Sequence, residues 1–338
     1  MKRLLVLLLA VVWAPLVGGV ELVVYSYDSF VTWGPALAIK EAFERAYPGV
    51  KLVWIAPGDS AEMLSRLISE LEFGLPTADV FIGVADAEVP RAWARGVFRR
   101  LELERLRNLA DVPAELRLPG DTFLVPYDHG YVTFVYNPAA LPQGVVLTSL
   151  EDLLRPELKG KIVLQDPRTS SPGLAFLLWT VARYGEAWPE FWKRLLPNVL
   201  TITKGWSESF EMLEAGEAAI VVSYATDEAY AHIVYGEARY RVWTPDGQGF
   251  RQVEYMGIVR TTKYPELAHA LLDFILSLEI QELIPTSQWM FPANAKARLP
   301  EKFAQYAVIP ERPVSLSLEE IGAKLSGWIR TWQELLGR

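Results

Sequence analysis

The first hundred residues alternate between two patterns of apolar and polar positions. Residues 22–27 (LVVYSY) are mostly apolar and rich in Val and Tyr, which predicts a buried strand, whereas residues 35–47 show the apolar spacing of an amphipathic helix. A second strand over 51–56 and a helix that begins at Asp59 follow, and then a third strand over 79–84. This β-α-β-α-β order predicts a largely parallel sheet with helices on both faces.

Polar residues stand at or soon after the end of each of these strands. Tyr27 ends the first strand and Asp28 follows it, Asp59 comes three residues after the second strand, and Asp86 comes two residues after the third. Because ligands of such sheets gather at the carboxyl ends of the strands, this edge is the expected binding site. Asp59 also has a purely structural interpretation: together with Glu62, three residues further on, it predicts a capping box at its helix start.

The middle of the chain repeats this alternation between two long extended runs, residues 123–136 and 252–260. Between these runs the apolar spacing predicts the following elements: helices over 149–154, from Ser170 onward and over 207–215, and strands over 161–164 and 219–224. Two extended runs that each carry the chain from one half of the molecule to the other predict two lobes in an α/β fold. The predicted division is a terminal lobe of residues 20–125 plus 256–338, a middle lobe of residues 126–255, and hinge crossings near 125–132 and 250–258.

The segment QDPRTSSPG, residues 165–173, marks the start of a helix. Ser before Pro is typical of a helix N-terminus, where a side chain caps free backbone N–H groups and Pro fits the first turn. Such a start, with small residues that leave its N–H groups accessible, attracts an anion such as a phosphate or a carboxylate. An ordinary capped helix is an equally good interpretation of this segment alone.

The N-terminus has the pattern of a secretory signal. Lys2 and Arg3 precede an apolar stretch over residues 4–14, and small residues, Gly18 and Gly19, follow it. We expect cleavage after Gly19 and a periplasmic mature protein. The alternative is an uncleaved membrane anchor, but a span needs about 20 apolar residues. The chain contains no Cys, so it cannot carry a lipid-modified cysteine.

Composition narrows the class of partner. The formal net charge is −8, and loss of the two cations in residues 1–19 makes it −10. An acidic chain is not expected to bind nucleic acid or anionic lipid. Without Cys, stability in an oxidising compartment must come from burial. The 338 residues suffice for two domains, since single cores stop growing near 250–300 residues.

Several segments, in order over nearly the whole mature chain, resemble the periplasmic thiamine-binding proteins of bacterial ABC importers. These segments are YSYDSF with WGP (25–35), QDPRTSSPG (165–173), TKGWSE (203–208), SY with Tyr230 (223–230) and IPTSQWMFP (284–292). The resemblance implies a two-lobed type II periplasmic binding protein fold, in which each lobe has a mostly parallel sheet and the ligand binds between the lobes. It implies thiamine, thiamine monophosphate or thiamine diphosphate as ligand.

The resemblance also implies roles for individual residues. Tyr27 and Tyr230 would flank the aminopyrimidine ring, and Asp59 would accept protons from its amine. Related sequences tend to have an acidic residue followed by Asp-Gly where this chain has Gly58-Asp59-Ser60, which leaves the placement of Asp59 open.

Three further aromatic residues, Trp206, Tyr224 and Trp289, would enclose the cationic thiazolium ring. Aromatic faces attract cations, by about 0.5–2 kcal/mol per contact. The alternative is that the tryptophans belong to hydrophobic cores, since the chain contains 12 of them.

The remaining candidates lie at the ends of the proposed ligand. Ser170 would approach the alcohol or phosphate, helped by backbone N–H groups near Gly173. Asp28 and Trp33 would lie beside the same cleft, although Asp28 equally suits a helix cap. The resemblance further implies that the mature protein is a monomer, needs no cofactor or metal, and delivers its ligand to an ABC permease and its ATPase in the inner membrane.

Two other classes of function remain open. An enzyme could use His129 beside Asp128 together with Ser170, but no G-x-S-x-G elbow is present, and His232 and His269 lack partners at metal-binding spacing. The other alternative is a binding protein for ferric iron, a polyamine or a phosphonate, because fold does not determine ligand.

Overall fold

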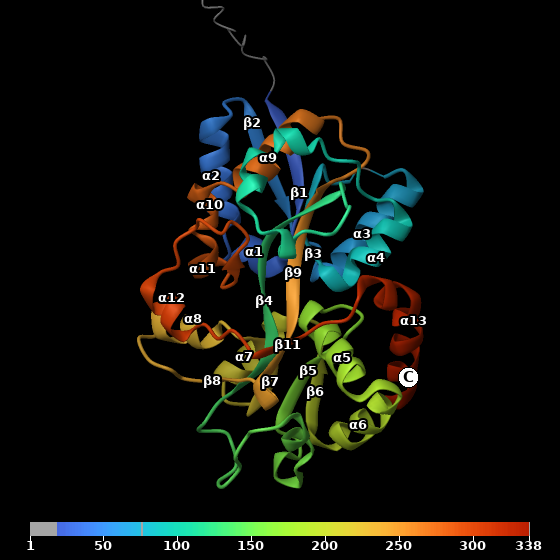
Figure 1. Ribbon diagram of the computed structural model, residues 1–338, viewed down its shortest axis with the longest axis vertical. Coiled ribbons are helices and arrows are strands. Elements are labelled where there is room, and N and C mark those ends of the chain that lie inside the picture. The colour runs from blue at the N-terminus through green and yellow to red at the C-terminus, as the bar shows by residue number, and fades with distance from the viewer. Residues whose placement is uncertain (1–18, 76, 338) are drawn as a thin grey trace, which may run out of the picture.

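The computed structural model describes residues 19–75 and 77–337, and it shows two lobes that share one mixed sheet (Figure 1). The sheet order is β2-β1-β3-β9-β4-β7-β5-β6, with β8 and β10 paired to β4 and β11 paired to β9. The predicted signal peptide, residues 1–19, lies outside the described residues except for Gly19. In the described part of the chain, no helix is both long and apolar enough to cross a membrane.

The strands are β1 (Val20–Tyr25), β2 (Val50–Ile55), β3 (Val80–Ala85), β4 (Leu124–Tyr136), β5 (Ile162–Gln165), β6 (Val199–Thr203), β7 (Ile220–Tyr224), β8 (Arg241–Trp243), β9 (Gln248–Ile258), β10 (Phe291–Pro292) and β11 (Arg312–Val314). The helices are α1 (Asp28–Thr32), α2 (Ala36–Ala46), α3 (Ser60–Phe73), α4 (Val89–Arg95), α5 (Ser171–Tyr184), α6 (Trp188–Leu195), α7 (Trp206–Glu214), α8 (Asp227–Val234), α9 (Pro265–Ile275), α10 (Leu278–Gln281), α11 (Ile284–Ser287), α12 (Glu301–Tyr306) and α13 (Leu318–Leu335). Short 3-10 helices cover Asp86–Glu88, Leu103–Arg105, Arg107–Asp111, Ala114–Leu116, Leu150–Leu154, Pro156–Leu158, Gly185–Ala187, Leu196–Asn198 and Pro245–Gly247. The strands and helices expected in the first hundred residues are confirmed to within about two residues.

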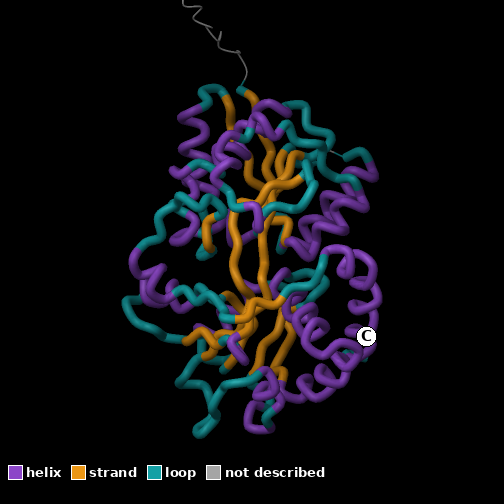
Figure 2. Tube along the Cα trace, in the orientation of Figure 1, coloured by secondary structure: helices purple, strands orange, loops and turns teal. Residues whose placement is uncertain are grey.

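Each lobe has a parallel group of strands, and two long strands join them. β2, β1 and β3 are parallel in the terminal lobe, and β6, β5 and β7 are parallel in the middle lobe. β4 and β9 lie between these groups, antiparallel to each other and to their outer neighbours. Figure 2 shows these two strands as the bridge between the halves of the molecule. The predicted hinge ranges, 125–132 and 250–258, fall within β4 and β9.

The C-terminal part of the chain differs from its predicted place in the terminal lobe. The amphipathic helix α13 buries Ile321 and Trp332 in the hydrophobic core of the middle lobe, where the Trp332 ring lies edge-on to Trp192, 6.1 Å between ring centroids. Its Gly322 still approaches Pro90 of α4 in the terminal lobe. The apolar stripe of α13 therefore packs against the middle lobe beside α6 (Figure 1).

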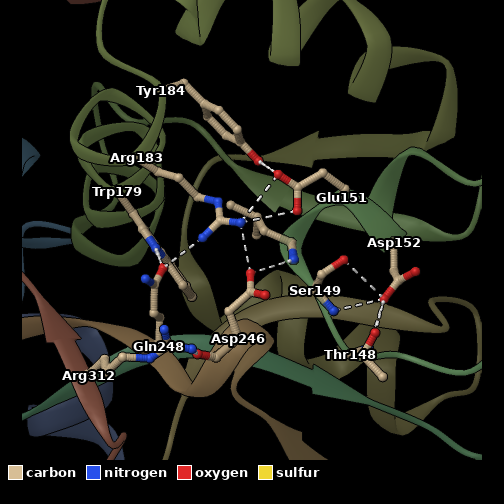
Figure 3. A network of polar contacts seen from close by, with 11 residues as sticks. Thr148, Ser149, Glu151, Asp152, Trp179, Arg183, Tyr184, Asp246, Gln248 and Arg312 are labelled. Carbon is tan, nitrogen blue, oxygen red and sulfur yellow. Dashed lines mark hydrogen bonds and ion pairs between the residues drawn. The ribbon is translucent and has the colours of Figure 1, made fainter.

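A polar network fixes the far side of the middle lobe (Figure 3). Arg183, near the end of α5, contacts Asp246 at 2.9 Å and Glu151 at 3.2 Å. Glu151 also accepts a hydrogen bond of 3.0 Å from the Tyr184 hydroxyl, and Gln248 accepts one of 3.3 Å from Arg183. The network ties the 3-10 helix Leu150–Leu154 to α5 and to the start of β9.

Candidate ligand-binding site

A cavity of about 420 Å³ lies between the two lobes, at the carboxyl ends of the parallel strands. The residues that line it are Tyr27, Ser29, Trp33, Asp59, Ser171, Pro172, Trp206, Ser207, Phe210, Glu211, Glu214, Tyr224, Asp227, Tyr230, Glu254, Thr286, Gln288, Trp289 and Met290. The lining contains aromatic rings, hydroxyls and five carboxyl groups, and it contains no Lys, Arg or His. Such a surface favours a flat ligand that carries positive charge.

Aromatic rings from the two lobes meet across this cavity. Trp33, which follows α1, lies 5.8 Å from Trp206 at the start of α7, and Trp289, which follows α11, lies 4.8 Å from Tyr230 on α8. The second pair is edge-to-face, at 84° between the ring planes. Because each pair joins one lobe to the other, a ligand between these rings contacts both lobes.

Trp206 is held in place by the middle lobe. Its ring stacks on Phe210 at 4.9 Å, and its Nε1 donates a hydrogen bond of 2.8 Å to the Ser223 hydroxyl at the end of β7. Tyr224, the next residue, lies at 6.2 Å from the Trp206 ring. Trp206 therefore keeps one face for the cavity while its polar edge is satisfied, which differs from a fully buried core tryptophan such as Trp179.

The backbone at two positions is adapted to these rings. Trp289 has φ +60°, in the left-handed region that residues other than Gly rarely adopt, and such conformations are frequent at functional sites. Gly83 in β3 has φ +104°, and a Cβ there would lie 2.4 Å from the ring of Tyr27. Only Gly at position 83 leaves room for Tyr27 at the base of the cavity.

Two aspartates in the cavity have strongly perturbed acidity. Burial raises the pKa of Asp59 to about 7, the charge of Asp28 adds to the rise, and Ser170 and the Trp206 backbone oppose it. Burial also raises the pKa of Asp227 to about 7, against the hydrogen bonds from Ser223 and the Tyr224 backbone. Among the described residues neither carboxyl is in an ion pair, and Lys204, whose charge interacts with Asp59, pairs with Glu62 instead. Both acids are therefore costly to ionise in the cavity.

The predicted capping box at Asp59 is wrong. Asp59 does precede α3, but its side chain makes no cap hydrogen bond, and its Oδ2 atom is buried without a partner. Instead Asp59 reaches across the cleft to Gly205, where a Cβ would lie 3.4 Å from its Oδ2. Glu62 forms an ion pair across the mouth with Lys204 of the middle lobe, at 2.8 Å.

Glu254, on the long strand β9, forms the floor of the cavity. Its Oε2 accepts hydrogen bonds from the hydroxyls of Tyr27, at 2.5 Å, and Tyr127, at 2.6 Å. Its Oε1 accepts one of 3.0 Å from Gln252, and Gln288 donates to the Tyr27 hydroxyl. The floor is therefore one connected set of neutral donors around a carboxyl group.

The structure brings most of the predicted site residues to this cavity. Those that line it are Tyr27, Trp33, Asp59, Trp206, Tyr224, Tyr230 and Trp289. Asp28 does not line it: this residue is exposed at the start of α1, and its Oδ1 accepts a hydrogen bond from the Ser29 backbone. Asp28 does not cap this helix either, because Tyr27 is the N-cap residue of α1 and no side chain makes a cap hydrogen bond there.

Ser170 and Gly173 are also outside the lining. Ser170 is fully buried, and its hydroxyl does not cap α5. It makes no hydrogen bond of good geometry with the described residues, but it lies close enough to the Asp59 carboxyl to oppose the rise in the pKa of Asp59. A Cβ on Gly173 would lie 2.6 Å from the carbonyl oxygen of Gln165, so this glycine is needed to pack α5 against β5. Their neighbours, Ser171 and Pro172, present the first turn of α5 to the cavity instead.

The sequence prediction missed the acidic part of the site. Glu254, Asp227, Glu211 and Glu214 all line the cavity. Glu254 had a visible signal, because an acid inside the extended run QVEYMGI is buried when the run becomes a central strand. Asp227 also had one, since it begins α8 soon after the end of β7.

Comparisons with known proteins agree with this geometry. The model of the family "Bacterial extracellular solute-binding protein" matches residues 38–311. The chain belongs to this family. The solute-binding protein is 35% identical over 343 residues to the "Thiamine-binding periplasmic protein" of Salmonella typhimurium, and 35% identical over 342 residues to that of Escherichia coli, in each case over the full length of both chains.

A solved structure titled "Periplasmic thiamin binding protein" has the same fold as this solute-binding protein. Its TM-score is 0.84 at 33% sequence identity, with 94% of this chain and 96% of that chain covered. The resemblance inferred from the sequence segments and the two-lobed α/β fold with flanking helices are both confirmed.

Proposed function

We propose that the protein binds thiamine in the cavity between its lobes and delivers it to an ABC permease. The observation that carries this proposal is the composition of the cavity: aromatic rings from both lobes, five carboxyl groups, and no basic side chain. Thiamine joins a flat aminopyrimidine to a permanently cationic thiazolium. Both parts suit aromatic faces, and the cation suits a cavity that lacks positive charge of its own.

Binding and closure are one event in the proposed mechanism. A ligand that contacts Trp33 and Trp289 on one lobe and Trp206 and Tyr230 on the other has more contacts in the closed form, so it shifts the population toward closure. The long strands β4 and β9 are the segments on which the lobes turn. No covalent bond is made or broken in this protein, and ATPases of the permease drive release.

The proposed location is the periplasm, after removal of residues 1–19. The relatives in Salmonella typhimurium and Escherichia coli are named as periplasmic proteins, which supports this part of the proposal. The mature protein acts as a monomer with no cofactor or metal. Mass spectrometry of the secreted protein tests the cleavage site: a mature N-terminus at Val20 is expected, and an intact Met1 in a membrane fraction contradicts it.

The direct test is calorimetric titration of refolded, ligand-stripped protein. We expect saturable binding of one thiamine per chain. The same titration with thiamine monophosphate and thiamine diphosphate measures how well the first turn of α5, at Ser171 and Pro172, accommodates a phosphate next to an acidic lining. Absence of saturable binding with all three forms contradicts the proposal.

A polyamine is the second candidate ligand, and the five carboxyl groups of the lining favour it. Polyamines are flexible chains with several positive charges and do not need flat aromatic walls. Spermidine in the same calorimeter separates the candidates: we expect thiamine to bind far more tightly. Tighter binding of spermidine, unaffected by loss of Trp206, would instead assign the protein to polyamines.

A further inference from the structure

Two buried carboxyl groups face each other at the hinge. Asp128 on β4 and Glu254 on β9 are opposite residues in the antiparallel pairing of these strands, so their side chains lie on one face of the sheet, with Cβ atoms about 5 Å apart. Asp128 is fully buried and Glu254 is 4% exposed. Two like charges this close cannot both be ionised in a buried site, so the pair holds at least one proton.

The hydrogen bonds of the pair are unequal. Three neutral donors, on Tyr27, Tyr127 and Gln252, point at Glu254. Among the described residues neither carboxyl oxygen of Asp128 has a partner at good hydrogen-bond geometry, and the Tyr127 hydroxyl that lies near it donates to Glu254. Donors of this kind stabilise the ionised form of a carboxyl group. The negative charge therefore belongs on Glu254, and the proton belongs on Asp128.

The pKa values of Asp128 and Glu254 also indicate that the proton is on Asp128. Burial, and next the charge of Glu254, raise the pKa of Asp128 well above its ordinary value, and the Tyr127 hydroxyl alone opposes the rise. Burial raises the pKa of Glu254 too, but the donors on Tyr127, Tyr27 and Gln252 oppose the rise. The titratable groups that interact with Glu254 are Tyr27, Asp59, Asp86, Tyr127, Asp128 and Tyr224, and none of them is a cation.

The two carboxyl groups also differ in whether they face the cavity. Glu254 lines the cavity, whereas Asp128 lies beneath it and does not. Tyr27 and Tyr224 stand around Glu254, the first bonded to it directly and the second through Gln252, at 3.2 Å. A cation held against these rings lies beside the Glu254 carboxylate.

We propose that Glu254 is the counter-charge for the ligand's cation, and that neutral Asp128 limits the hinge pair to one negative charge and so favours a ligand with one positive charge at this position. This inference rests on the proposed function, because it takes thiamine as the ligand. It makes Glu254 a specificity-determining residue and Asp128 a positioning residue.

The test compares two ligands on three proteins. The ligands are thiamine and an uncharged analogue in which a thiophene ring replaces the thiazolium, and the proteins are the wild type, Glu254→Gln and Asp128→Asn. We expect the wild type to prefer thiamine at least tenfold. Glu254→Gln should lose most of this preference, whereas Asp128→Asn, which mimics a protonated Asp128, should keep it. Equal preference in Glu254→Gln and wild type, or equal loss in both variants, overturns the inference.

A second measurement covers the case that Glu254→Gln fails to fold. Lowering the pH protonates Glu254 and removes the counter-charge, so the ratio of thiamine to analogue affinity should fall as the pH falls. Asp59 and Asp227 also line the cavity and titrate near pH 7, so the measurement is made on the wild type and on the Asp59→Asn, Asp227→Asn double variant, in which these two groups no longer titrate. Both ligands contain the same pyrimidine, so its titration cancels in the ratio. A ratio in the double variant that does not fall with pH, down to the point at which the protein unfolds, contradicts the inference. If thiamine itself fails to bind at any pH, the proposed function fails instead.

Discussion

Two clusters of acidic side chains in this protein differ in what balances their charge. On the far side of the middle lobe, Glu151 and Asp246 both contact the guanidinium of Arg183. Burial alone would raise the pKa of Glu151, but hydrogen bonds from its backbone and Tyr184, with the charge of Arg183, hold it below its ordinary value. Each acid of this network contacts a cation of the protein itself (Figure 3).

The cavity between the lobes has the opposite arrangement. Asp59 and Asp227 have pKa values raised to about 7, and the pKa of Glu254 is raised as well. Buried acids without a cation destabilise the protein that carries them. The comparison therefore separates two uses of the same chemistry: the Arg183 network stabilises the fold, whereas the cavity keeps its acids unpaired for a positively charged ligand.

Breaking the Arg183 network is expected to have the largest effect on the contrast between the two clusters. Arg183→Leu leaves Glu151 and Asp246 without their cation, and we expect a loss of about 2–3 kcal/mol in the free energy of unfolding. Thiamine affinity should stay unchanged, because the network lies outside the cavity. Denaturant unfolding with a parallel calorimetric titration measures both quantities. The matched control is Arg105→Leu, which removes an exposed ion pair with Glu102 and should cost little. An altered thiamine affinity in Arg183→Leu would mean that the network contributes to binding as well as to stability, which contradicts the contrast between the two clusters.

The converse effect is expected at Trp206. Trp206→Ala removes an aromatic face of the cavity, and we expect thiamine binding to weaken at least tenfold, about 1.4 kcal/mol. Thermal unfolding of the empty protein should change little, because Trp206 is only half-buried. Trp179→Ala, which empties a fully buried site, is the control and should lower the stability by about 3–5 kcal/mol. A large loss of stability with unchanged affinity in Trp206→Ala would place this residue among the core tryptophans.

The regular part of the fold could be predicted because local pattern determines it. The alternation of strands and helices over β1 to β3 follows from apolar spacing alone, and the long strands β4 and β9 are visible as extended runs. The place of α13 could not be predicted this way. Its apolar stripe shows that the helix packs against something, but only the folded middle lobe determines that Trp332 meets Trp192.

The same limit applies to the site. Residues at strand ends, such as Tyr27 and Tyr224, could be assigned because sheet topology brings those ends together. The sequence shows where α5 begins but not which side of its first turn faces the cavity, so it could not distinguish Ser170 from Ser171, which lines the cavity. Glu254 depends on the register between β4 and β9, which is a long-range property. The position of Glu254 in the site could therefore be found only from the structure.

A smaller effect follows from Asp59 and Asp227, two aspartates of the cavity lining whose pKa values are raised. Asp59 and Asp227 bind protons more tightly in the folded than in the unfolded chain, so stability should fall as the pH rises from about 4 to 7 and then level off. We expect the Tm of the ligand-free protein to be a few degrees lower at pH 8 than at pH 5. Asp59→Asn and Asp227→Asn should each reduce this slope, measured by calorimetric scans across the range. A Tm that rises over this range in the wild type, or slopes that both variants leave intact, would remove the contrast with the Arg183 network.

The smallest effect is expected at the mouth of the cleft, where Lys204 of the middle lobe forms an ion pair with Glu62 of the terminal lobe. The Lys204 side chain is 67% exposed, so this pair should be worth about 0.2–1 kcal/mol to the closed form. Lys204→Ala should therefore weaken thiamine binding by less than about fivefold, and added salt should shrink the difference from the wild type, because salt screens an exposed pair. Titrations of both proteins at low and high salt measure this, with Lys193→Ala, which removes an exposed ion pair away from the cleft, as the control. A salt-independent loss of tenfold or more would mean that Lys204 contacts the ligand, and the cavity would then have a cation of its own.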